Sequence, residues 1–146
     1  MSMEQIIVRV PSGKVRVKEG KCPNGCSLMN TDKLMSGKPA VTLLLRLKGQ
    51  SGLIHLNPYY GVFEYESDIP LEKGDVVDMF CPHCGTSLMT EQECQMCHAP
   101  MFVIHLPKGG EVRVCPRVGC QNHQLTIVDL EAQFAELYED ERRPMM

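Results

Sequence analysis

The stretch "FCPHCGTSLMTEQECQMCHAPM", residues 80–101, contains two Cys-x-x-Cys pairs. Cys81 and Cys84 form the first pair, Cys94 and Cys97 form the second, and nine residues separate the two pairs. Two cysteines in one tight turn can direct both sulfur atoms at one ion, and a second turn can supply the other two ligands of a tetrahedral site. Proline and glycine favour such turns. The stretch therefore predicts a metal centre built from these four cysteines.

The same stretch resembles the short zinc-ribbon units that occur singly or in tandem in many proteins. The shared pattern is Cys-Pro-x-Cys-Gly-x-x-Leu, a short spacer and Cys-x-x-Cys, and here it reads "CPHCGTSL", "MTEQE" and "CQMC". The resemblance covers residues 81–97 and departs from the pattern at His98, where these units usually have glycine. It implies that all four cysteines bind zinc, and it implies no particular activity.

The other four cysteines also lie in two close pairs. The segments "CPNGC" (residues 22–26) and "CPRVGC" (residues 115–120) share the form Cys-Pro-…-Gly-Cys. Each follows a segment in which apolar residues alternate as in a β-hairpin, residues 6–17 and residues 102–114. This echo predicts a duplicated unit, a hairpin followed by a cysteine turn, near the two ends of the chain.

Two equivalent turns from two equivalent hairpins can face one ion. We therefore favour one centre made by the central four cysteines and a second made by the remaining four, Cys22, Cys26, Cys115 and Cys120. The alternative joins the Cys94 pair to the Cys115 pair, because the 17-residue gap between Cys97 and Cys115 also suits a zinc ribbon. Four cysteines complete a closed structural site in either arrangement.

Zinc is the metal that we expect, with two ions per chain. Iron in a rubredoxin-type centre is the alternative, because four cysteines bind either metal. Rubredoxin-type folds usually carry aromatic residues around the iron, and this chain has only 5% aromatic residues. The segment "CPHC" also resembles the active site of thioredoxin-fold oxidoreductases, whose first cysteine lies at a helix N-terminus. No helical pattern follows it here, which favours metal binding over redox chemistry.

Alternating apolar residues recur along the chain and predict short β-strands. Near the C-terminus, Thr126 and Asp129 match a capping box, and apolar residues at helical spacing follow. We expect a mainly β fold of small zinc-stapled hairpins and a zinc ribbon, with one C-terminal α-helix. The expected organisation is a single compact domain, residues 1–146, with echoing units at 1–26 and 101–125, a central zinc ribbon at 75–100 and a helix at 126–141.

The charge and the apolar segments do not favour some classes of protein. The formal net charge is −3 and the chain has no polybasic run, which does not favour binding to nucleic acid through phosphate groups. The N-terminal segment does not match a signal peptide, and no apolar run approaches the ~20 residues of a membrane span. We expect a cytoplasmic protein without membrane contact, where cysteines are metal ligands more often than disulfides.

The sequence contains no glycine-rich phosphate loop, no nucleophile elbow and no His-Glu-x-x-His motif. A catalytic zinc keeps one position open for water, whereas closed four-cysteine sites do not. We therefore expect a non-catalytic zinc-binding protein that acts as an interaction or regulatory module and binds another protein. The alternatives are a rubredoxin-like iron electron carrier and a nucleic-acid-binding zinc-ribbon protein.

Overall fold

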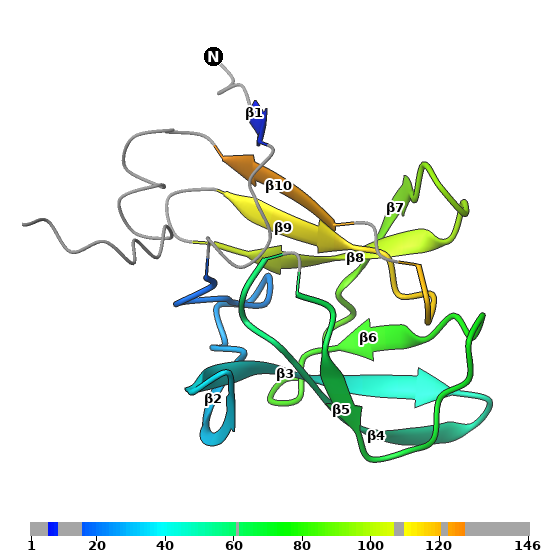
Figure 1. Ribbon diagram of the computed structural model, residues 1–146, viewed down its shortest axis with the longest axis horizontal. Helices are drawn as coiled ribbons and strands as arrows, with labels where there is room; N and C mark the ends of the chain where they lie inside the picture. The colour runs from blue at the N-terminus through cyan, green and yellow to red at the C-terminus, as the bar shows by residue number, and fades with distance from the viewer. Residues whose placement is uncertain (1–5, 9–15, 61, 107–109, 121–122, 128–146) are drawn as a thin grey trace, which may run out of the picture.

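The computed structural model describes residues 6–8, 16–60, 62–106, 110–120 and 123–127. This part of the chain forms ten strands in two antiparallel sheets and contains no helix (Figure 1). The mainly β class is therefore confirmed. Thr126 lies in a strand, and the rest of the predicted helix, after residue 127, lies outside the described residues.

The first sheet consists, in spatial order, of β1 (Ile6–Val8), β10 (His123–Ile127), β9 (Glu111–Val114), β8 (Pro100–His105) and β7 (Met89–Glu93). The second sheet consists of β2 (Met29–Met35), β3 (Lys38–Leu47), β4 (Gln50–Leu56) and β5 (Tyr65–Ser67), with β6 (Asp78–Phe80) also paired to β3. Figure 1 shows the first sheet above the second.

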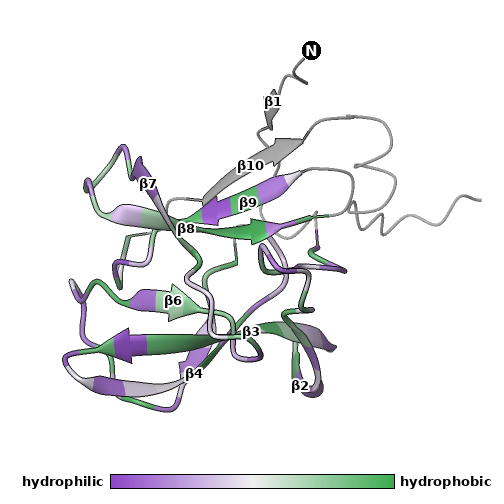
Figure 2. Ribbon diagram, turned by 180° about the vertical axis from the view of Figure 1, so that it is seen from behind, coloured by the Kyte–Doolittle hydropathy of each residue, from purple (hydrophilic) through white to green (hydrophobic). Residues whose placement is uncertain are grey.

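The main hydrophobic core lies between the two sheets. Leu43 and Leu45 of β3 and Phe102 and Ile104 of β8 are buried in one cluster. Each pair is two residues apart because alternate residues of a strand face the same side. In Figure 2 the hydrophobic colour follows much of β3 and β8, the two strands that carry this core. A core of mostly aliphatic residues together with Phe102 thus holds the sheets together.

The structure tests one of the two predicted echoing hairpins in full and the other in part. The hairpin at residues 102–114 is confirmed, because β8 pairs with β9. The predicted hairpin at residues 6–17 has its turn outside the described residues. On either side of that turn the chain has other partners, since β1 pairs with β10 and Arg16 pairs with Tyr59. The division of the chain into the predicted units stays a prediction.

The strands β2 and β6 share one edge of β3, and both run antiparallel to it. The last residue of β6, Phe80, pairs with Leu44, and the first residue of β2, Met29, pairs with Val41. The end of β6 therefore faces the start of β2 across a short gap along β3. The cysteine turn that precedes β2 and the turn that follows β6 meet at this gap.

The first sheet brings the other two cysteine turns together. The turn at residues 94–97 connects β7 to β8, and the turn at residues 115–120 follows β9. Phe102 near the start of β8 pairs with Val114 at the end of β9. Because the two strands are antiparallel neighbours, the turn before β8 and the turn after β9 lie at the same end of the sheet.

Gly20 offers a test of this packing, because its backbone lies against the core. A methyl group added at Gly20 would lie 2.7 Å from Cγ2 of Ile104 and 3.2 Å from Cγ1 of Val17, and both of these side chains are buried. Overpacking of a core costs about 1–3 kcal/mol. We expect Gly20→Ala to lower the free energy of unfolding by that amount in urea denaturation of the metal-loaded protein.

The matched control is Ser51→Ala, which changes an exposed residue of β4. Exposed substitutions usually change stability by less than about 0.5 kcal/mol. Equal unfolding midpoints for Gly20→Ala and Ser51→Ala would contradict the close approach of the residue 20 backbone to β8.

Candidate metal centres

The eight cysteines gather into two groups of four. In each group the four Sγ atoms lie within 4.8 Å of one another, which is close enough to hold one metal ion. All eight cysteines are free thiols, with no disulfide among them. The first group is Cys22, Cys26, Cys81 and Cys84, and the second group is Cys94, Cys97, Cys115 and Cys120.

This grouping corrects the one that we favoured from the sequence. The two Cys-x-x-Cys pairs of residues 80–101 do not share a centre, and neither do the pairs near the two ends of the chain. Cys84 instead lies with Cys22, at 3.8 Å between sulfur atoms, and Cys97 lies with Cys115, at 3.4 Å. The alternative that joined the Cys94 pair to the Cys115 pair is the one found. The reason is the strand order, which brings different turns together.

Backbone N–H groups point at the first sulfur of the turns. Cys22 Sγ accepts hydrogen bonds from the N–H groups of Asn24 and Cys26, both at 3.3 Å. Cys81 Sγ accepts one from His83, and Cys94 Sγ accepts one from Met96, each also at 3.3 Å. Such bonds stabilise the thiolate form that binds metal and fix the direction of the sulfur.

Each turn contains one residue with a left-handed backbone. Gly25 and Gly119 have φ of 93° and 96° and directly precede the second cysteine of their turns. Gly85 and His98 have φ of 78° and 68° and directly follow the second cysteine of theirs. His98 thus adopts the same left-handed conformation as Gly85 at the matching position of its turn, and histidine is among the residues that tolerate it. Each centre combines one turn of each kind.

In the first centre, one thiol is poised to lose its proton and another is held in the protonated form. The side-chain amide of Asn24, with Nδ2 3.5 Å from Cys84 Sγ, and then the N–H of Thr86 lower the pKa of Cys84 to about 6. The hydrogen bond with Cys22 raises the pKa of Cys26 to about 12. Adjacent thiols resist joint ionisation because thiolates repel one another, and a bound cation removes that obstacle.

The second centre is more enclosed and has a cation beside it. Burial raises the pKa of Cys115 and Cys120, whereas the N–H of Ala99 is the main cause that lowers the pKa of Cys97. The Arg117 guanidinium also lies against Cys97, which raises the pKa of that arginine. Nη1 of Arg117 donates to Gly74 O at 3.1 Å, which holds the guanidinium in place.

The positive charge of Arg117 suits a site of this kind. Four thiolates around a divalent ion carry a net charge of −2, and burial of such a charge needs compensation. Neither Arg117 nor Asn24 is among the site residues expected from the sequence. Each lies inside a cysteine turn, two residues after its first cysteine, so a basic or amide residue at that position is the signal that could have indicated them.

A cleft of about 400 Å³ opens between the two sheets and reaches the second centre. Cys115 and Cys120 border it. Its walls are mostly apolar and come from both sheets, and they include Val41, Leu56, Tyr60, Phe102, Val114 and Val118. The cleft was not indicated by the sequence, because its wall residues are scattered along the chain.

Comparison with models of known protein families gave no match, and comparison with curated proteins and with solved structures gave none either.

Substitution in pairs tests the grouping. In a Cys22→Ser, Cys26→Ser variant, we expect Cys81 and Cys84 to become reactive to a thiol-alkylating reagent, because they lose the partners that complete their site. The four cysteines of the second group should stay protected. Mass spectrometry of the digested, alkylated protein identifies the labelled residues.

The matched control removes the Cys115 pair instead and should expose Cys94 and Cys97 alone. Labelling of Cys115 and Cys120 in the first variant would restore the grouping favoured from the sequence.

Proposed function

We propose that this protein is a non-catalytic module in which two zinc ions each join two cysteine turns, one ion in each group of cysteines. The observation that carries the proposal is the convergence of four sulfur atoms within 4.8 Å at two separate places. Four thiolates are a complete tetrahedral ligand set for zinc. Two such sets in one small chain support a structural role for the metal.

The position of the ligands supports structural rather than catalytic zinc. Cys22 and Cys81 in the first group and Cys94 and Cys115 in the second are buried. Both groups also pack against apolar residues of a hydrophobic core. A metal held in this way stabilises the chain, since structural zinc contributes about 10 kcal/mol of apparent binding free energy. That is comparable to the whole net stability of many domains.

A protein partner is the proposed ligand of the module. The apolar cleft between the sheets supports this, because concave apolar sites with a few polar groups are typical places of binding. Tyr59, Tyr60 and Arg117 are among the residues that line it. Tyrosine and arginine are enriched at protein interfaces. A partner that inserts an apolar side chain would fit these walls.

In the described part of the chain no helix could cross a membrane.

Metal analysis tests the first part of the proposal. We expect two zinc ions per chain in protein purified without added metal, because two complete ligand sets are present. The protein should be colourless, whereas iron in a four-cysteine site is red. Elemental analysis and an absorption spectrum decide between them. One ion per chain, or none, would contradict the proposal, and a red protein with two iron ions would favour the electron carrier.

Affinity capture tests the second part of the proposal, that a protein partner binds in the cleft. Val118 is half-buried in the cleft wall, so Val118→Glu places a charge where an apolar side chain would dock. We expect this variant, still loaded with two metal ions, to capture at least about tenfold less of the partner than the parent does, as for loss of a central contact. Quantitative mass spectrometry of the captured proteins gives the ratio.

The control is Met96→Glu, which adds the same charge at an exposed residue away from the cleft wall. A protein that binds the parent and both variants equally does not use the cleft. If all captured proteins behave in that way, the proposed docking site is wrong.

A further inference from the structure

Residues 20–64, the first half, and residues 79–120, the second half, repeat the same local structure within the described part of the chain. In the first half Leu28 N donates to Gly20 O at 2.8 Å, and in the second half Leu88 N donates to Met79 O at 2.9 Å. Both leucines are fully buried, and each follows a cysteine turn. Gly20 and Met79 therefore hold equivalent positions, two residues before the first cysteine of each turn.

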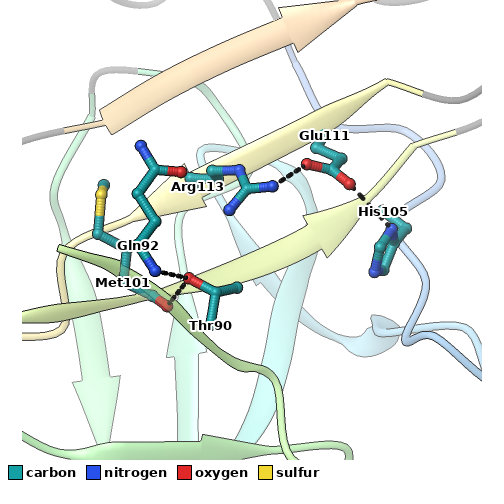
Figure 3. Close-up of polar contacts among 6 residues, drawn as sticks. All are labelled: Thr90, Gln92, Met101, His105, Glu111 and Arg113. Carbon is teal, nitrogen blue, oxygen red and sulfur yellow. Dashed lines mark hydrogen bonds and ion pairs between the residues drawn. The ribbon is translucent and has the colours of Figure 1, made fainter. Parts of the chain in front are cut away.

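The strands that follow these turns match as well. The N–H groups of Met29 and Met89 each donate to the serine hydroxyl two residues earlier, at 3.2 and 3.1 Å. Asn30 Oδ1 and Thr90 Oγ1 then each accept from the N–H two residues later, at 2.9 and 3.2 Å. Figure 3 shows Thr90 in this role. Both strands shift register against their partners in this region, β2 between Asn30 and Leu34 and β7 between Met89 and Glu93.

In each half, the residue directly before the first cysteine of the turn pairs with a strand of the other half. Lys21 pairs with His105 of β8 through two backbone hydrogen bonds, at 2.8 and 3.0 Å. Phe80 pairs with Leu44 of β3. Thr42 N donates to Leu28 O, and Val103 N donates to Leu88 O. Leu44 and His105 each lie two residues after these donors, so they are equivalent as well. Such a reciprocal exchange is what an approximate two-fold axis produces.

The repeat assigns a counterpart in the first half to ligands of the second centre. Pro39 pairs with Leu34, and Pro100 pairs with Glu93, so Met35 holds the position of Cys94. Met35 and Cys94 are both buried, at 4% and 0% exposure. The turn after Met35 is two residues shorter than the turn after Cys94, so the position of Cys97 has only an approximate counterpart there.

Asn57 holds the position of Cys115. Each directly follows the strand that pairs with the central strand of its half, and each precedes a proline. Their exposure is alike, at 7% and 5%. Val62 likewise corresponds to Cys120, since Val62 N donates to Tyr59 O at 3.1 Å and Cys120 N donates to Arg117 O at 3.0 Å.

Asn57 makes hydrogen bonds where Cys115 has a sulfur cluster. Its Nδ2 donates to Ser36 Oγ and to Glu64 Oε1, both at 3.0 Å. Its Oδ1 accepts from Tyr59 N at 2.9 Å. In the second half, the thiol of Cys115 takes the place of Oδ1 and accepts from the N–H two residues later.

We infer that the cluster of Ser36, Asn57 and Glu64 is the first half's counterpart of the second metal centre, in which hydrogen bonds replace the ion and join the same two turns. This inference rests on the proposed zinc at the second centre. It implies that the two halves differ in metal dependence. The turns at the end of the β8–β9 hairpin need metal to hold them together, whereas hydrogen bonds hold the turns at the end of the β3–β4 hairpin.

A graft tests the equivalence directly. Residues 35–38 are replaced by Cys-Gln-Met-Cys-His-Ala, the sequence of residues 94–99, and Asn57→Cys and Val62→Cys are added. We expect three zinc ions per chain, one more than in the parent. The matched control carries the same insert with Asn57→Ser and Val62→Ser and should bind two. A folded graft that binds only two ions would overturn the inference.

A single substitution gives a second test that does not depend on the folding of the graft. In metal-loaded Asn57→Ala protein, we expect hydrogen exchange at the Tyr59 amide to rise roughly tenfold, because its acceptor is gone. Both metal ions should stay bound, and exchange at the Arg117 amide should be unchanged. Asn30→Ala, which removes an amide that does not contact Tyr59, is the control.

The outcomes separate this inference from the proposed function. An unchanged Tyr59 amide, or loss of a metal ion from Asn57→Ala, overturns the inference while two ions in the parent leave the proposed function standing. A parent chain that binds no zinc contradicts the proposed function and the inference with it.

Discussion

One edge of β3 carries two strands, and the first cysteine group depends on this sharing. β6 pairs with the second half of β3 and ends at Phe80, while β2 pairs with its first half and begins at Met29. The cysteine turns at the two strand ends are therefore neighbours, although Cys22 and Cys84 are 62 residues apart in the sequence. Closing a loop of that length costs conformational entropy, which the strand pairing and the proposed metal together offset.

The second group needs less of the fold. Its two turns lie at one end of adjacent strands, and Cys97 and Cys115 are 18 residues apart. A single hairpin, β8 with β9, is enough to bring them together. Each group thus combines the same two kinds of turn, but bringing the turns together costs more conformational entropy in the first group, where the loop is longer. Arg117 adds a positive charge to the second group, in keeping with the burial that raises the pKa of Cys115.

The approximate two-fold relation of the halves also explains the place of the cleft. Its walls include pairs of equivalent residues, such as Val41 with Phe102 and Leu56 with Val114. The cleft therefore lies where the two halves face each other. A partner bound there would contact both halves at once. The first cysteine group takes two cysteines from each half, so a metal bound there would also help to shape the proposed binding site.

The sequence by itself determined the local chemistry of this protein. The cysteine pairs, their proline and glycine residues and the alternating strands all depend on neighbours along the chain, and the structure confirms tight turns and a mainly β fold. The zinc-ribbon resemblance at residues 81–97 covered four cysteines that the fold divides between two groups. The segments "CPNGC" and "CPRVGC" belong to different groups, although their likeness predicts two parts of one centre.

Only the tertiary structure decided which turns meet. Two cysteines within one turn are held together by a few backbone angles, so their spacing in the sequence is informative. Two turns are brought together by strand order and register, to which residues far from either turn contribute. Leu44 and Val41 place two of the turns beside each other, and neither residue lies near a cysteine in the sequence. The grouping of the cysteines is for this reason a property of the sheets and not of the cysteine spacing.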